Sequence, residues 1–181
     1  MIVWMFSVTR PRPGRGGRLS APTGMSSILG LNLALGKGEL RLRSSDHGDQ
    51  PYLDYNYLEE AEDRRRLQDG IRMLVGLEDH PAMSALIERR LNPLDSDLES
   101  DDALEAWMRR DVSTGHHVSC TCKMGPSTDS MAVVDQYGKV HGLEGIRVVD
   151  ASIMPDCIRA NTNVTTMVIG EQVSDFIKQG R

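Results

Sequence analysis

Two histidines and two cysteines lie close together in the segment STGHHVSCTCKMG, residues 113–125. His116 and His117 could act as catalytic bases, because histidine changes its charge near neutral pH. Cys120 and Cys122 could bind zinc or form a redox-active pair. The segment therefore allows three kinds of chemistry: a metal site, a thiol pair, or acid–base catalysis.

The cysteine spacing disfavours the first two. Structural zinc sites usually place two to four residues between paired cysteines, and thioredoxin-like pairs place two, but a single residue, Thr121, separates Cys120 from Cys122. No pattern fixes Cys157 as a further ligand. We therefore expect no bound metal and interpret the cysteines as buried packing residues. For the histidines, a loop setting favours chemistry, but the residues alone leave a catalytic and a structural role equally open.

Composition narrows the class of protein. The 181 residues suit one domain, and 39% hydrophobic and 26% charged residues are values of a globular chain. A net charge of -5 argues against nucleic acid as the main partner. No apolar run approaches the ~20 residues of a membrane span. Three cysteines do not make a disulfide framework, so we expect a cytoplasmic protein.

The elements that must position this segment are groups of strands and groups of helices, which alternate along the chain. Apolar and alternating runs predict strands, and helical spacing of apolar residues predicts helices. The strands are expected at 2–8, 26–35, 38–44, 132–134, 139–141 and 146–149, and the helices at 59–80, 81–91, 99–112 and 163–180. Ser100 or Asp101 is the expected cap of the third helix. This order predicts an α+β fold with an antiparallel or mixed sheet. We expect strands near Leu40, Val133 and Val148 to form that sheet, covered by helices near Leu67 and Trp107.

Three blocks then suggest a family. HVSCTCKMG, GKVHGLEGIRVVDASIMP and NTNVTTMVIGEQVSDFI occur in this order, starting at residues 117, 138 and 161. Together they resemble the C-terminal part of the glucose–methanol–choline (GMC) oxidoreductases, flavoproteins that oxidise alcohols, including choline dehydrogenase-like enzymes. GELRLRSSDHGDQPYLDYNYL, from residue 38, also resembles a segment of that family. We expect residues 31–181 to form the family's C-terminal domain, and residues 1–30 to be an irregular N-terminal segment or a truncated start.

The resemblance implies a role for each site residue. His117 is the base that removes the hydroxyl proton of a small alcohol, while the carbon-bound hydrogen passes to FAD as hydride. Asn161 orients the substrate oxygen. The remaining residues that the resemblance places against the cofactor are His116, Asp150, Ala151, Thr162, Asn163 and Val164.

One part of the family's pattern is not found. The Gly-x-Gly-x-x-Gly unit that binds dinucleotides is absent, and the nearest glycine cluster, RPGRGGR at 12–18, leads into no helix. The sequence therefore predicts the C-terminal portion of a larger enzyme, whose FAD-binding part belongs to the same gene or to a separate chain. The last helix would pack on that absent Rossmann-like domain. Alone, the chain is expected to be marginally stable, to self-associate and to hold FAD weakly. The alternative is a non-catalytic remnant or interaction domain that retains the fold.

Overall fold

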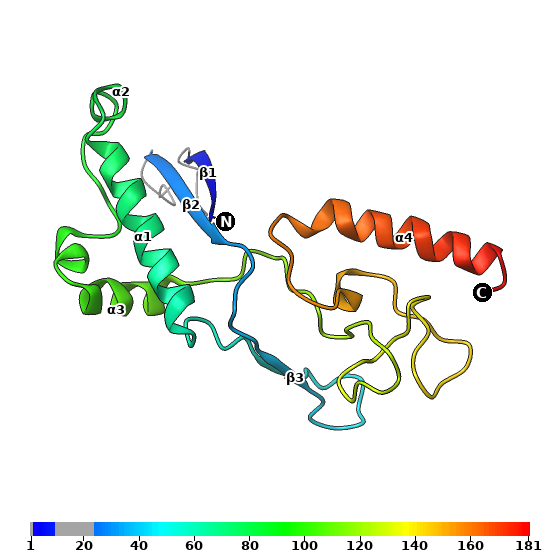
Figure 1. Cartoon of the computed structure of the whole chain (residues 1–181). Helices are drawn as coiled ribbons and strands as arrows, with labels where there is room; N and C mark the ends of the chain where they lie inside the picture. The colour runs from blue at the N-terminus through cyan, green and yellow to red at the C-terminus, as the bar shows by residue number, and fades with distance from the viewer. Residues whose placement is uncertain (1, 10–23) are drawn as a thin grey trace, which may run out of the picture. The chain divides into compact units, whose positions relative to one another are not determined.

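The structure is a computed structural model that describes residues 2–9 and 24–181. The chain divides into two compact units (Figure 1). We call the first, residues 2–9, 24–31 and 56–112, the helical unit. The second, residues 32–55 and 113–181, is called the site unit. Residues 10–18, which include the glycine cluster RPGRGGR, lie outside the described residues.

The helical unit begins with a two-stranded antiparallel sheet. Strand β1 (Ile2–Thr9) pairs with β2 (Gly24–Leu31), from Ile2 opposite Leu31 to Thr9 opposite Gly24. The second predicted strand therefore ends at Leu31 and does not reach residue 35. Leu33 adopts a left-handed backbone with φ 51°, which a continuing strand does not allow.

Two long helices supply the core of this unit. Helices α1 (Ala61–Glu78) and α3 (Asp101–Asp111) confirm the predicted helical segments. Ile71 of α1 and Leu104 and Met108 of α3 form one buried cluster with Leu58, which precedes α1, and Leu29 of β2 packs against it. Ser100 is the cap of α3, because its side chain accepts a 3.1 Å hydrogen bond from the backbone N–H of Ala103.

The helix expected at 81–91 is much shorter. Helix α2 spans Pro81–Ser84, and a 3-10 turn, η1 (Asp95–Leu98), follows further along. The missing part buries little apolar surface, since Leu86 is 82% exposed and Leu91 48% exposed. A short helix without a buried face is marginal in water. The prediction of a helix to residue 91 was therefore wrong.

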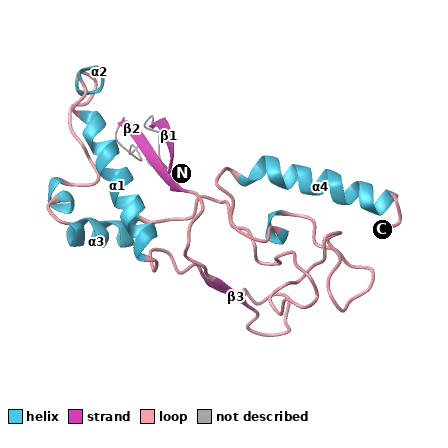
Figure 2. Ribbon diagram, in the orientation of Figure 1, coloured by secondary structure: helices cyan, strands magenta, loops and turns pink. Residues whose placement is uncertain are grey.

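The site unit is mostly loop (Figure 2). Strand β3 (Glu39–Arg41) pairs antiparallel with β4 (Tyr52–Asp54). The α+β class is confirmed, but the predicted sheet arrangement is wrong. The segments at 132–134, 139–141 and 146–149 make isolated bridges and do not join β3 in one sheet. The helices that contain Leu67 and Trp107 pack in the core of the helical unit instead of covering such a sheet.

A tight turn connects two of these segments. Asp135 accepts backbone hydrogen bonds from Tyr137 at 2.8 Å and Lys139 at 2.9 Å through its side chain. Gly138 completes the turn with φ 76°, a conformation that costs other residues energy. A Cβ at Gly138 would lie 2.8 Å from the carbonyl oxygen of Val148. The turn brings Val134 opposite Val140, and these two residues form an isolated antiparallel bridge.

Replacing Gly138 with alanine should therefore destabilise the site unit. The left-handed backbone alone should cost about 1–2 kcal/mol in the free energy of unfolding. Overlap with Val148 should add about 1–3 kcal/mol. Gly142→Ala is the matched control, because Gly142 also has φ 76° but nothing lies within 4 Å of its added Cβ. Urea denaturation followed by circular dichroism measures both variants. Equal costs would show that the contact with Val148 does not constrain the turn.

The last helix, α4 (Thr162–Lys178), is covered on one side. Val173 is 3% exposed, and the ring of Phe176 meets that of Tyr137 edge-on at 5.1 Å. Several other apolar side chains of α4 are at least 55% exposed: Val164, Met167, Val168 and Ile177. This matches the expectation that the core of the chain covers the helix incompletely. Among the described residues, no helix has the length and apolar character needed to cross a membrane.

Candidate active site

The segment that follows the two histidines is held by backbone hydrogen bonds. A short 3-10 helix, η2 (Ala151–Ile153), accepts three of them through consecutive carbonyl groups. The donors are the N–H groups of Cys120, Cys122 and Met124, at 3.3, 2.9 and 2.9 Å. Ile153, 1% exposed, anchors η2 in the interior. The residues after His117 are therefore fixed to a buried support, which limits where the histidine ring can lie.

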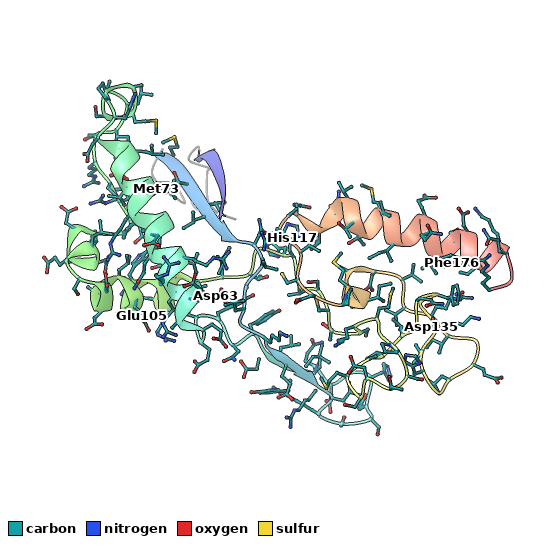
Figure 3. The ribbon with its side chains drawn as sticks, in the orientation of Figure 1. Asp63, Met73, Glu105, His117, Asp135 and Phe176 are labelled. Carbon is teal, nitrogen blue, oxygen red and sulfur yellow. The ribbon has the colours of Figure 1, made fainter. Side chains whose placement is uncertain are left out.

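The two histidines have different settings. His116 has a left-handed backbone with φ 60°, and its N–H donates a 3.0 Å hydrogen bond to Oγ1 of Thr114. Histidine tolerates this conformation better than most residues. The side chain of His116 is exposed. His117 instead meets the N-terminal end of α4 (Figure 3).

His117 makes a hydrogen bond through each of its ring nitrogens. Nδ1 lies 2.9 Å from Oγ1 of Thr162, and Nε2 lies 2.8 Å from Nδ2 of Asn161. The partners are adjacent residues, and they lie 44 and 45 positions after the histidine. The structure thus brings together the two residues, His117 and Asn161, that the resemblance singled out as catalytic.

The start of α4 fixes the orientation of the Asn161 amide. Asn161 is the N-cap residue of the helix, and its Oδ1 accepts a 2.9 Å hydrogen bond from the backbone N–H of Asn163. Because Oδ1 must face that N–H, the other end of the amide, Nδ2, faces His117. Nδ2 is a donor, so the facing Nε2 is the acceptor. An exposed donor and an exposed acceptor therefore stand side by side.

The other predicted residues lie in two places. Asp150 caps η2, since its Oδ1 accepts a 2.8 Å hydrogen bond from the N–H of Ser152, and Ala151 is the first residue of η2. Asn163 and Val164 are exposed in the first turn of α4. Thr162 is 8% exposed and directs its hydroxyl to His117. This contact was not foreseen in the sequence, where Thr162 was assigned to the flavin; its position directly after Asn161 is the one available signal.

The cysteines of the segment are free thiols in the structure. Burial raises the pKa of Cys120, and Cys157 and Asp156 act in the same direction, while a hydrogen bond to Ser119 and the charge of Lys37 lower it. A raised pKa keeps the thiol protonated and unreactive at neutral pH. Within residues 2–9 and 24–181, no three His, Cys, Asp or Glu side chains gather as a metal site would require. The absence of bound zinc stays a prediction, which elemental analysis of the purified chain would test.

Comparison with known proteins identifies the family. A sequence model described as GMC oxidoreductase matches residues 34–170. The chain belongs to the GMC oxidoreductase family, as the resemblance predicted. It is 43% identical over 155 residues to the oxygen-dependent choline dehydrogenase of Burkholderia lata, and 39% identical over 155 residues to that of Pseudomonas putida. Both matches cover 86% of this chain and 27% of the relative.

Solved structures show the same fold. A pyridoxine 4-oxidase from Mesorbium loti superposes with a TM-score of 0.79 at 27% identity, covering 88% of this chain and 31% of that one. A fungal aryl-alcohol oxidase gives a TM-score of 0.72 at 33% identity, covering 89% of this chain and 26% of that one. The chain therefore spans about a quarter of the length of the curated relatives that it matches.

Proposed function

We propose that this chain supplies the proton-transfer site of an FAD-dependent oxidoreductase that converts alcohols to carbonyl compounds. One observation carries the proposal: Nδ2 of Asn161, a donor, and Nε2 of His117, an acceptor, are exposed 2.8 Å apart. A hydroxyl group is both a donor and an acceptor, so it satisfies both atoms at once. A carboxylate would satisfy Asn161 and leave Nε2 without a proton donor.

The chemistry follows from these two roles. The hydroxyl enters between the two side chains, donating to Nε2 of His117 and accepting from Nδ2 of Asn161. The imidazole takes the proton as the carbonyl forms, and the amide stabilises the negative charge that develops on the oxygen. Because an amide does not titrate, Asn161 keeps this role across the pH range. FAD, when bound, supplies the acceptor for the hydride that leaves the carbon bearing the hydroxyl group.

The start of α4 fits the pyrimidine end of a flavin. The first turn of a helix presents backbone N–H groups and the positive end of the helix dipole, which favour negative charge. Oδ1 of Asn161 accepts a hydrogen bond from one of these groups, the N–H of Asn163. Asn163 and Val164 are exposed at that end of the helix. These two residues and Thr162 would hold the pyrimidine, with His116 beside it, and Asp150 and Ala151 would lie toward the ribityl and diphosphate groups.

Choline is the first substrate to test, because relatives 43% identical are named oxygen-dependent choline dehydrogenases. Aromatic alcohols come next, since a structural neighbour is an aryl-alcohol oxidase. The partner that would complete the site is a dinucleotide-binding part in the same gene or in a second chain. We place the start of the family domain at residue 31, where β2 ends. A cytoplasmic location stays a prediction from the cysteine content.

A chimera tests the proposal. The matched residues of this chain would replace the corresponding quarter of the Burkholderia lata choline dehydrogenase, which then supplies the rest of the enzyme. We expect the chimera to purify with flavin absorbance and to oxidise an alcohol. A chimera that binds flavin but oxidises none of a panel of choline, aliphatic and aromatic alcohols would favour the alternative, a non-catalytic interaction domain.

A further inference from the structure

We infer that Thr162 is a positioning residue that holds His117 in the tautomer required of a base, with the proton on Nδ1 and the lone pair on Nε2. The catalytic purpose of this tautomer rests on the proposed function, but the tautomer itself and the contact with Thr162 do not. It adds a role for the side chain of Thr162 to the flavin contact that the family resemblance implies for this residue.

The argument begins at the N-cap of α4. Oδ1 of Asn161 accepts from the N–H of Asn163, so Nδ2 of Asn161 points at Nε2 of His117. If Nε2 carried a hydrogen, it would face the hydrogens of Nδ2, and two donors would oppose each other at 2.8 Å. A neutral imidazole has one N–H and one bare nitrogen. The proton must therefore be on Nδ1.

Thr162 is placed to receive that proton in a hydrogen bond. Its Oγ1 lies 2.9 Å from Nδ1 and can accept from it. The side chain is 8% exposed, so water is a poor substitute for this partner. The tautomer of a histidine is set by the hydrogen bond that its second nitrogen makes. Asn161 and Thr162, adjacent at the start of one helix, thus specify the same tautomer from both sides of the ring.

The hydrogen bond between Nδ1 of His117 and Oγ1 of Thr162 remains in place after proton transfer. When Nε2 has taken a proton, Nδ1–H still donates to Oγ1 of Thr162, so the ring does not need to turn. Without the hydroxyl, Nδ1–H would lie against a buried apolar group and lose its partner. The other tautomer, with Nε2 protonated, would then become competitive, and that tautomer cannot accept a proton from a hydroxyl.

The experiment uses the full 181-residue chain labelled with ¹⁵N-histidine. Long-range proton–nitrogen correlation spectra at alkaline pH, where imidazole is neutral, distinguish the two tautomers. His117→Gln identifies the signals of His117 among the five histidines. We expect the proton on Nδ1 in the wild type. Thr162→Val, which keeps the shape of the side chain, should shift the ring toward a mixture or the opposite tautomer. Thr162→Ser should retain the wild-type spectrum.

Thr165→Val is the matched control, since it removes a threonine hydroxyl from the same helix three residues later. A wild-type ring protonated on Nε2, or an unchanged tautomer in Thr162→Val, would overturn the inference. If Thr162→Val does not fold, Thr162→Ala, which also removes the hydroxyl, gives the same comparison with the wild type. In the chimera, Thr162→Val should lower turnover roughly 3- to 10-fold, the factor of one neutral hydrogen bond. A chimera without alcohol oxidation but with the expected tautomers would refute the proposed function and leave this inference standing.

Discussion

Replacing His117 with alanine in the flavin-loaded chimera is expected to lower turnover of alcohol by about 10²–10⁴-fold, the range for a lost acid–base group. Nε2 of His117 is the acceptor beside the Asn161 amide, and its removal leaves the hydroxyl proton without a base. Steady-state kinetics measures the loss. The melting temperature should fall only modestly, because the ring is exposed, although the variant loses the two hydrogen bonds that the ring makes.

His116→Ala is the control for this variant. His116 precedes the base by one residue, but its side chain is not part of the pair with Asn161. Because His116 is proposed to lie beside the flavin but not to accept the hydroxyl proton, His116→Ala should lose far less turnover than His117→Ala, and both variants should keep the absorbance of oxidised flavin. Large loss from His116→Ala together with an active His117→Ala would reverse the assignment of the base.

The second large effect is expected from Asn161→Asp. Aspartate still accepts from the N–H of Asn163 and caps α4, so the free energy of unfolding should be nearly unchanged. However, the donor that faces Nε2 becomes a carboxylate oxygen. The carboxylate favours a protonated imidazole, which cannot act as a base, and the alkoxide loses its hydrogen-bond donor. We expect turnover to fall by about 10²–10³-fold.

Asn161→Ala separates the two roles of this side chain. It should lose turnover in the same way but also cost about 0.5–2 kcal/mol in stability, because the cap of α4 is removed. Urea denaturation and steady-state kinetics on the two variants give the comparison. An Asn161→Asp chimera with turnover close to that of the parent would show that the amide nitrogen takes no part in the reaction.

The family resemblance assigned His117 and Asn161 to one site, because the motifs that contain them occur in family-like order and spacing, and the structure places Nδ2 of Asn161 2.8 Å from Nε2 of His117. The helices were predictable for a different reason. Leu104 and Met108 repeat at helical spacing, and Ser100 is a cap that its residue type already favours. These features depend on local interactions, which sequence patterns report well.

The sheet and the role of Thr162 depend on tertiary context. Strand-like residues near Val133 and Val148 lie between glycine turns, and their residue types are compatible both with a ladder and with the isolated bridges that the structure shows. The contact between Thr162 and His117 joins residues 45 positions apart through the fold. A hydroxyl at that position is compatible with flavin contact, helix initiation or histidine binding, and the three-dimensional arrangement distinguishes them.

The most direct test of the account is the anaerobic reduction of the chimera's flavin by an alcohol, followed as loss of oxidised-flavin absorbance after rapid mixing. This measurement isolates the step in which the alcohol is oxidised from later reoxidation. We expect choline or another alcohol of the panel to bleach the flavin of the parent chimera, and His117→Ala to bleach it at least ~10²-fold more slowly at saturating alcohol. Equal bleaching rates in the two proteins would contradict the assignment of His117 as the base and the site built around it.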